Sequence, residues 1–388
     1  MNSHLINSLL ETSPLQEQWT ILCVDDEENI LNKIWYENKL FYLQCLLIPF
    51  SFLFGLIIYL RRSYLKRFAN IKNKVPVLVI GNLTVGGSGK TPLIIALVKF
   101  LKSQNKKVGV IARGYPVSPE NPIILEKTSS AQEVGDEAIL VFKETNVPVC
   151  VSKNRQAALQ ELLKHHDLDY VLSDDGLQNY HFHHDVEIII YDKQLKFGNK
   201  KLLPAGPLRE PLSKLNKVDF VLEKIFLNEN ENENENLKFL DESFALSDLI
   251  GVESKSTQKI YPFFITYQNF VCVLDQGKKN KKTVESDYFF NKKVVVVTAI
   301  AQTSAFFEYL KSKNIIFSFV TYHDHYLFSE SDFIKFSDCE IIMTAKDAVK
   351  CQQFANEHFW YLELEANFSA AFLADFERLI VNHFYSMG

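Results

Sequence analysis

Short apolar runs rich in β-branched residues recur along the middle of the chain, and they alternate with patterns typical of amphipathic helices. The runs lie at residues 75–81, 107–113, 147–153, 169–175, 186–192 and 218–224. Residues 91–104 and 154–166 carry apolar positions at helical spacing. Strands that are apolar along their whole length are buried on both faces, as in parallel sheets covered by helices. The pattern therefore predicts an α/β fold with a mostly parallel sheet.

The same alternation returns after a low-complexity segment. Residues 228–236 read NENENENEN, which has no apolar side chain to bury and predicts a solvated loop. Apolar runs at 292–301, 314–322, 339–347 and 359–366 then predict a second, smaller α/β lobe. The expected organisation is an extension of unknown role at 1–30, an apolar helix with a basic flank at 31–70, a first lobe at 71–225, a connection with the Asn/Glu-rich insertion at 226–290, and the second lobe at 291–388.

The longest uncharged run, FYLQCLLIPFSFLFGLIIYL at residues 41–60, predicts a membrane helix. As a helix it is roughly 30 Å long, about the thickness of one hydrocarbon core. Four basic residues follow closely: Arg61, Arg62, Lys66 and Arg67. By the positive-inside rule they keep the downstream lobes in the cytoplasm.

The flanks and interior of this run leave an alternative open. Trp35, Tyr36 and Tyr42 lie near its beginning, where we expect interfacial aromatic side chains. Gln44, Pro49 and Ser51 suit a membrane interior less well, so a buried core helix, or a helix lying flat at the interface, is the alternative.

Composition narrows the class of protein. The chain has 388 residues, of which 47% are hydrophobic and 23% charged, values ordinary for a globular protein with two domains. A formal net charge of −5 gives no reason to expect nucleic acid as a partner. The six cysteines are scattered without CxxC spacing, which argues against a disulfide framework or a zinc site and suits a reducing compartment.

The segment TVGGSGKT at residues 84–91 follows a predicted strand and opens a predicted helix. It matches the P-loop pattern G-x-x-x-x-G-K-[ST] except at its first position, and it makes the fold P-loop NTPase-like. Backbone N–H groups at such a helix N-terminus cradle phosphates, the lysine reaches the β- and γ-phosphates, and the threonine hydroxyl binds Mg²⁺. The predicted nucleotide-binding positions are Thr84, Val85, Gly86, Gly87, Ser88, Gly89, Lys90 and Thr91. A β-branched Thr84 implies that the first loop position does not take a positive φ.

The segment SDDGLQN at residues 173–179 places two carboxylates, Asp174 and Asp175, at the end of an apolar strand. That is the carboxyl edge of the sheet, where ligands bind in open α/β folds. One carboxylate could hold Mg²⁺ while the other acts on an acceptor hydroxyl. The alternative is a turn that uses Asp-Asp-Gly for its conformation.

Three further segments carry candidate chemistry. VGDEAIL, at 134–140, places Asp136 and Glu137 at a helix start, where acids can also simply complement the helix dipole. HDHYLF, at 323–328, offers a His–Asp pair for acid–base work or an ordinary surface loop. LLPAGPLREP, at 202–211, is stiffened by prolines, and we expect Arg209 and Glu210 to project from it. The histidines of HFHHD, at 181–185, alternate along an extended segment, which disfavours a metal site there.

Taken together and in this order, these stretches resemble one family, the tetraacyldisaccharide 4′-kinases, or lipid A 4′-kinases, of Gram-negative bacteria. The resemblance covers about residues 30 to 385. Its matching pieces are KIWYENKLFYL, VIGNLTVGGSGKTP, ARGY, VGDEA, SKNRQAA, SDDGLQNY, FGNKKLLPAGPLREPLSKL, the DH of HDHYLF, and MTAKDAVKC.

The resemblance implies a monotopic enzyme of the bacterial inner membrane, with its catalytic lobes on the cytoplasmic face. It implies transfer of the γ-phosphate of ATP to the 4′-hydroxyl of tetraacyldisaccharide 1-phosphate, which forms lipid IVA. ATP and Mg²⁺ are then the cofactors and an acylated disaccharide phosphate is the membrane lipid substrate, with no obligatory protein partner evident.

The resemblance also implies roles for individual residues. Ser88, Lys90 and Thr91 would bind ATP and Mg²⁺, with Asp175 as a second metal ligand. Asp174 and Asp175 would be the metal and catalytic carboxylates, and Asp136 with His325 would form the dyad that deprotonates the acceptor. Further active-site positions would be Glu137, Arg155, Gln178 and Glu210.

Two positions depart from the family pattern. Asn179 stands where His is usual, and Ala345 stands where Glu is usual. Because an asparagine does not titrate, a base at position 179 is excluded, which favours Asp136 and His325 as the base. Since these two residues lie in different lobes, we expect closure of the lobes over ATP to assemble them.

Two other functions fit parts of the pattern. A membrane-tethered P-loop ATPase switch that acts on a protein partner would need no histidine from the second lobe. A soluble small-molecule kinase would use the apolar run as a core helix.

Overall fold

The computed structural model describes residues 30–37, 39–67, 72–180, 182–227, 244–245, 258–300 and 302–384. The predicted extension, apart from residue 30, and the Asn/Glu-rich insertion lie outside these residues.

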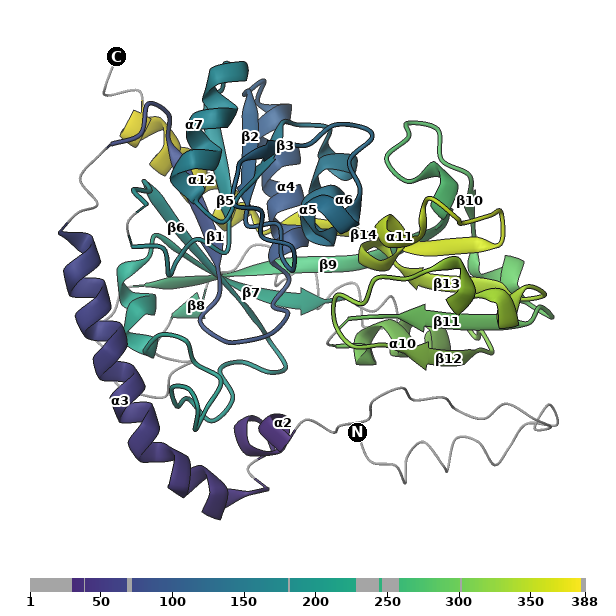
Figure 1. Cartoon of the computed structure of the whole chain (residues 1–388), viewed down its shortest axis with the longest axis horizontal. Coiled ribbons are helices and arrows are strands. Elements are labelled where there is room, and N and C mark those ends of the chain that lie inside the picture. Colours follow the sequence, from purple (N-terminus) through teal and green to yellow (C-terminus); the bar gives the residue numbers. More distant parts are fainter. Residues whose placement is uncertain are drawn as a thin grey trace.

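Six parallel strands form the centre of the first lobe (Figure 1). They are β1 (Val77–Gly81), β2 (Val108–Ala112), β4 (Val149–Val151), β5 (Tyr170–Asp174), β6 (Val186–Asp192) and β7 (Phe220–Phe226), with the short antiparallel β3 (Ile123–Ile124) at the edge. Every residue of β1, β2, β4 and β5 is buried, as their uninterrupted apolar sequences require. The predicted mostly parallel α/β sheet is confirmed.

Helices cover both faces of this sheet. They are α4 (Lys90–Ser103), α5 (Ala131–Val134), α6 (Asp136–Thr145) and α7 (Arg155–His165). Leu93 and Leu97 of α4 join the core on one face, and Leu159 and Leu162 of α7 join the core on the other. The helices thus shield the strands, while the carboxyl ends of β1 and β5 open toward the second lobe.

The second lobe repeats the arrangement on a smaller scale. Its elements are β11 (Val294–Thr298), α10 (Ser304–Ser312), β12 (Ser318–Thr321), β13 (Glu340–Thr344), α11 (Ala345–Cys351) and β14 (Phe359–Phe368). The apolar run at 339–347 is a strand only as far as Thr344, because the Thr344 side chain accepts a hydrogen bond from the Asp347 N–H and starts α11. Short 3₁₀ turns lie at Leu212–Lys217, Val273–Asp275, Ser286–Phe289, Glu330–Asp332 and Ile334–Phe336.

One long strand that the sequence pattern did not predict joins the two lobes. β9 (Lys259–Cys272) lies in the region expected to be a connection, and it pairs in parallel with β7 and antiparallel with β14. The short β8 (Phe244–Ala245) and β10 (Thr283–Val284) also pair with it. Within the described residues, 14 strands therefore form one sheet, in the order β12-β11-β13-β14-β9-β7-β6-β1-β5-β2-β4-β3 with β8 and β10 beside β9.

The last helix, α12 (Ala370–Phe384), belongs to the first lobe and not to the second, where the expected boundary placed it. Phe372 and Phe376 are fully buried in the first-lobe core. The Phe372 ring lies 5.1 Å from that of Phe220 and 5.7 Å from that of Tyr261, centroid to centroid. The chain therefore returns across the junction, and β9, β14 and α12 fasten the lobes together.

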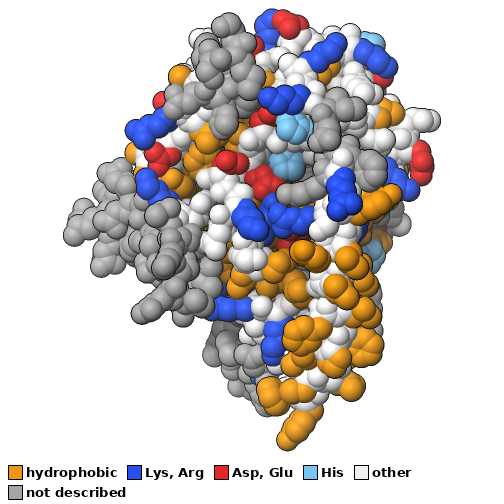
Figure 2. All heavy atoms as spheres, turned by 90° about the vertical axis from the view of Figure 1, so that its left-hand side faces the viewer, with side chains coloured by type: hydrophobic (Ala, Val, Ile, Leu, Met, Phe, Trp, Pro, Cys, Tyr) orange, Lys and Arg blue, Asp and Glu red, His pale blue; other side chains and the backbone are white. Residues whose placement is uncertain are grey.

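The apolar run forms α3 (Phe41–Lys66), which follows the short α2 (Ile30–Trp35) and lies along the side of the first lobe (Figure 1). It is long and apolar enough to cross a membrane by length and composition, and only 11% of its most apolar window is buried. In Figure 2, hydrophobic side chains cover its outward face, and Lys and Arg side chains gather above them.

Two polar side chains of the apolar run, Gln44 and Ser51, face the protein. Ser51 Oγ donates to the Leu202 carbonyl at 2.8 Å and accepts from the Ala205 N–H at 3.0 Å, and Gln44 is buried as well. Gln44 and Ser51, two of the three residues that weakened the membrane pattern, therefore contact the first lobe, whereas Pro49 is exposed. The sequence suggested that Trp35 is an interfacial aromatic residue, and this was wrong. Trp35 is buried, and its indole N–H donates to the Pro204 carbonyl at 3.0 Å.

The packing of α12 predicts the cost of a cavity at its centre. Replacement Phe372→Ala should lower the free energy of unfolding by about 3–5 kcal/mol, because the first-lobe core loses a fully buried ring. Urea denaturation followed by circular dichroism measures the change. Val381→Ala, at an exposed position of the same helix, should change it by less than about 0.5 kcal/mol. Equal effects of the two variants would contradict the placement of α12.

Candidate active site

The predicted phosphate loop connects β1 to α4. Gly86 and Gly89 have φ of 107° and 89°, values that glycine takes without strain, and Gly89 caps α4. Thr84 does not have a positive φ, as its β-branched side chain suggested. It forms an antiparallel bridge with Leu208. The Asn82 side-chain amide donates to the Gly86 carbonyl at 3.3 Å. The loop conformation is thus set by contacts to the segment around residue 208 and not by a first glycine.

The groups around this loop suit a phosphate chain. Lys90 begins α4 beside the backbone N–H groups of the helix N-terminus, and Thr91 follows in the first turn. Ser88 is buried, and its hydroxyl has no hydrogen-bond partner among the described residues. A side chain at Gly89 would meet Lys224, whose ammonium is paired with Asp192 at 2.6 Å. A nucleotide phosphate would fit this cradle of donors.

Asp174 and Asp175 meet the phosphate loop at the end of β5. Lys90 Nζ lies 3.6 Å from Asp175 Oδ1. Burial alone would raise the pKa of Asp175, but Lys90 and Arg209 hold that pKa well below its usual range. Burial, followed by the charge of Glu137, raises the pKa of Asp174 to about 7. The pKa values of these two neighbouring carboxylates therefore shift in opposite directions, and Asp175 is the ionised member of the pair.

Arg209 is a site residue that the sequence analysis did not assign. Its guanidinium donates to both Asp175 oxygens at 3.0 Å and to the Asn82 carbonyl at 3.0 Å, so it links the Asp pair to the strand that enters the phosphate loop. Bidentate pairing of this kind fixes carboxylate geometry. An arginine in a proline-stiffened loop was the available signal, but the loop's path past β1 was not visible in the sequence.

The two other predicted positions near this cluster have mainly supporting contacts. Arg155 is buried and donates to the backbone carbonyls of Asp174 at 2.8 Å and Ser152 at 3.1 Å, so it holds the end of β5. Gln178 Nε2 donates to the Asn82 carbonyl at 3.4 Å.

Glu210 was expected to project from its loop, but its side chain is completely buried. Arg62 at the basic end of α3 lies 4.0 Å from its carboxylate, and burial raises the pKa of Glu210. Arg62 also lies over the Tyr180 ring, 5.8 Å from its centroid. The basic end of α3 therefore contacts the loops that follow Asp175 and Arg209 in sequence.

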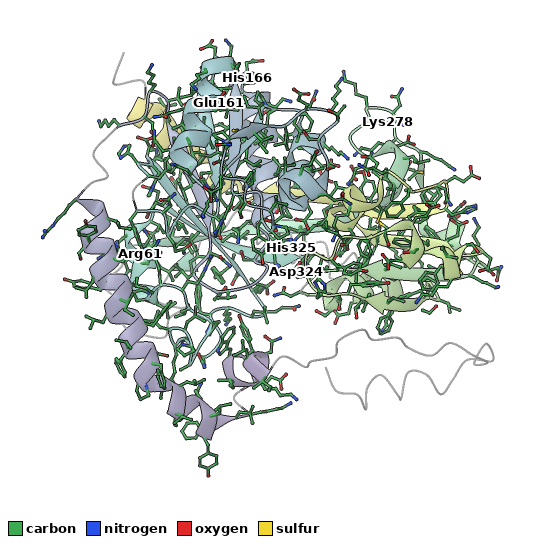
Figure 3. The ribbon with its side chains drawn as sticks, in the orientation of Figure 1. Arg61, Glu161, His166, Lys278, Asp324 and His325 are labelled. Atoms are coloured by element: carbon green, nitrogen blue, oxygen red, sulfur yellow. The ribbon has the colours of Figure 1, made fainter. Side chains whose placement is uncertain are left out.

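The Asp136–His325 pair predicted from the resemblance forms across the two lobes. Asp136 begins α6 and is 2% exposed, and His325 Nδ1 lies 3.0 Å from each of its carboxylate oxygens. The His325 ring also packs edge-on against Tyr115, with centroids 4.7 Å apart. Figure 3 places His325 and Asp324 where the two lobes meet. The pair is already assembled in this structure, so the expectation that lobe closure must assemble it does not hold here.

Two lysines of α11, to which no role was assigned from the sequence, lie beside Asp136 and Glu137. Lys346 Nζ lies 3.2 Å from Glu137 and 3.9 Å from Asp136, and Lys350 Nζ lies 4.0 Å from Asp136. Burial would raise the pKa of Asp136, but the His325 hydrogen bond and both lysines lower it below its usual value. A lysine just after a strand of the second lobe was the signal that could have identified Lys346.

The histidine-rich segment 181–185 makes no comparable cluster. His184 Nε2 lies 2.7 Å from Glu187, and His181 is outside the described residues. Among the residues that the structure describes, no group of three or more His, Cys, Asp and Glu side chains is arranged to hold a metal ion.

Known proteins are similar to this chain in sequence and fold. The profile of the LpxK family, described as tetraacyldisaccharide-1-P 4′-kinase, matches residues 43–381. A tetraacyldisaccharide 4′-kinase of Legionella pneumophila (strain Corby) is 35% identical over 88% of this chain and 94% of its own length, and one of Blochmanniella pennsylvanica is 36% identical over 87% and 91%. The crystal structure of LpxK from Aquifex aeolicus in complex with ATP has a TM-score of 0.67 at 26% identity and covers 88% of this chain and 100% of its own.

The lowered pKa of Asp136 predicts a pH-dependent contribution to stability. The contribution is fully present above the pKa of the unfolded chain, about 4, and is lost as pH falls through the lower folded value. In urea denaturation, Asp136→Asn should lower the free energy of unfolding by roughly 3 kcal/mol at pH 7 and by progressively less below pH 4. The exposed Asp287→Asn is the control. A difference that stays constant with pH would contradict the assignment.

Proposed function

The chain belongs to the tetraacyldisaccharide-1-phosphate 4′-kinase family, and from that premise we propose how its own residues perform the transfer. The enzyme is an ATP-dependent kinase of lipid A biosynthesis whose acceptor is the 4′-hydroxyl of tetraacyldisaccharide 1-phosphate. The observation that supports the residue assignment is the convergence of three groups at one junction: the phosphate loop, the Asp174–Asp175 pair, and Asp136 bonded to His325 of the other lobe.

The first part of the proposal concerns nucleotide. Residues 84–91 hold the triphosphate of ATP, with Lys90 beside the β- and γ-phosphates. Thr91 and Asp175 are the proposed ligands of Mg²⁺, which neutralises phosphate charge when bound. Arg209 keeps Asp175 ionised and oriented toward Lys90. The ATP-bound Aquifex aeolicus structure supports a nucleotide in this fold.

The second part concerns the acceptor. With the Nδ1 proton of His325 donated to Asp136, the free electron pair of the ring is on Nε2. His325 Nε2 accepts the proton of the 4′-hydroxyl while that oxygen attacks the γ-phosphorus, and the bond from the γ-phosphorus to the β–γ bridging oxygen of ATP breaks. Asp136 stabilises the imidazolium that forms and holds the ring in place.

The third part concerns the membrane. We infer that α3 embeds in the bacterial inner membrane and keeps both lobes on its cytoplasmic face, with Arg61 and Arg62 near the anionic headgroups. The acyl chains of the substrate hold it in the same bilayer. Because Arg62 contacts Glu210 and Tyr180, the anchor and the catalytic loops are seated together. We expect neither nucleic acid nor an obligatory protein partner.

A tethered P-loop ATPase switch is the rival function, and it is not favoured by the family match. It also would not require His325, whose contact with Asp136 is built into the junction of the lobes.

Substitution of the dyad tests the function and the assignment. Wild-type protein with ATP, Mg²⁺ and tetraacyldisaccharide 1-phosphate should phosphorylate the 4′ position. His325→Ala and Asp136→Asn should each lower kcat by about 10²–10⁴-fold, because the first removes the general base and the second removes the carboxylate that orients its ring and stabilises the imidazolium. Their ATP affinity, measured by isothermal titration calorimetry, should stay within about threefold of wild type. Undiminished transfer by both variants would exclude the dyad as the base.

The exposed face of α3 predicts membrane binding. Phe52→Lys with Leu56→Lys places two charges on side chains that are 76% and 53% exposed, so cosedimentation with anionic vesicles should drop at least tenfold. Transfer to substrate in detergent micelles should persist, because neither side chain contacts the site. Ile316→Lys, at a 74% exposed apolar position of the second lobe, is the matched control. Vesicle binding equal to wild type in the double variant would argue against insertion of α3.

A further inference from the structure

The ammonium of Lys346 lies among charged groups from both lobes. Its Nζ is 3.2 Å from Glu137 of the first lobe and 3.4 Å from Asp324 of the second. It is also 3.5 Å from Nε2 of His325, the ring nitrogen that Asp136 does not use. Lys346 therefore contacts the atom that must receive the acceptor proton.

Lys346 stands on a rigid support. It is the second residue of α11, which begins with the Thr344 cap. Asp347 beside it is fully buried, accepts hydrogen bonds from Thr298 Oγ1 at 2.9 Å and Thr344 Oγ1 at 2.7 Å, and pairs with Lys350 at 2.7 Å. The backbone is held, while the long Lys346 side chain, 18% exposed, has a flexible four-carbon stem.

Lys346 is not the only group that compensates the charge of Asp136. Asp136 also faces Lys350 and the His325 imidazole. Burial would lower the pKa of Lys346, but Glu137, Asp136 and Asp324 raise it above its usual value, so the group stays an ammonium. It can leave its resting partners only for another anionic group.

The carboxylate that Lys346 contacts is electrostatically coupled to the Asp pair at the phosphate loop. The charge of Glu137, which Lys346 contacts, acts on Asp174, and the adjacent Asp175 meets Lys90 at 3.6 Å. Lys90 and Lys346 thus flank one acidic group from opposite lobes. A transferred phosphoryl group carries charge on three equatorial oxygens, and contacts from the phosphate loop approach it from one side only.

We propose that Lys346 is a second-lobe cation of the transfer, which leaves His325 Nε2 and contacts a non-bridging oxygen of the γ-phosphoryl group when ATP and acceptor are bound. Its departure opens Nε2 to the acceptor hydroxyl, and its arrival stabilises charge in the transition state. Lys346 keeps its protons throughout, because the acceptor proton goes to His325 while ADP leaves. The inference rests on the proposed roles of His325 and the phosphate loop.

A competing role is purely structural, with Lys346 only tying the lobes together through Glu137. Both roles predict that loss of the lysine harms the enzyme, so the tests must detect contact with the phosphoryl oxygen. Sulfur in place of a γ-oxygen, as in ATPγS, weakens a hydrogen bond to that oxygen and slows transfer. Loss of the contacting group should reduce this penalty.

The experiment uses the full-length enzyme with tetraacyldisaccharide 1-phosphate. Lys346→Ala should lower kcat about 10²–10³-fold with ATP affinity within about threefold, and Lys346→Arg should lose less because it keeps a cation. The ratio of rates with ATP and ATPγS should fall in Lys346→Ala, and added methylammonium should restore part of its activity. Lys311→Ala, at an exposed position of α10 in the same lobe, should match wild type.

The outcomes separate the hypotheses. A wild-type kcat in Lys346→Ala would overturn the proposal, and so would a lower kcat with an unchanged ATP/ATPγS ratio and no methylammonium rescue. Lys346→Met, which keeps the length of the side chain without its charge, gives the same comparison if Lys346→Ala does not fold. If wild type transfers phosphate to the 4′ position, any of these failures removes only the role of Lys346. Absence of wild-type transfer would instead remove the function itself.

Discussion

The contact between the buried Asp136 carboxylate and the His325 imidazole is the interaction on which the arrangement of the site depends. An ionised carboxylate that is 2% exposed is costly unless it is paired, and here its partners come from the other lobe: His325, Lys346 and Lys350. The first lobe alone offers Asp136 the N-terminus of α6, where the Glu137 N–H donates to it at 2.9 Å, but no cation within ion-pair distance among the described residues. The cost of burial therefore holds the lobes in one relative position, and the same position sets the proposed base beside the phosphate loop.

The sheet makes that position durable. β9 pairs with a strand of each lobe, and α12 returns to pack Phe372 into the first-lobe core, so hydrogen-bonded strands and a shared core connect the lobes. A lysine that changes partners, as we propose for Lys346, suits such a frame better than a large closure of lobes does.

Much of the first lobe was predictable because its signals are local. The six parallel strands follow apolar runs, α4 and α7 follow helical spacing, and the phosphate loop is a contiguous motif, whereas the short β3 was not predicted. Asp136 and His325, by contrast, are 189 positions apart, and only the family resemblance joined them before the structure did. β9 was missed because an isolated apolar run between low-complexity and polar segments has no periodicity that reveals its partners.

The sequence by itself determined the α/β class, the membrane-helix candidate and the phosphate loop, since each depends on neighbours along the chain. The tertiary structure decided which polar residues serve the site. Arg209 and Glu210 are adjacent, and both were expected to project from their loop, yet Arg209 donates to both oxygens of Asp175 while Glu210 is buried near the basic end of α3. Lys346 acquires its role in the same way, because charge acts through space and its carboxylate partners are brought to it only by the fold.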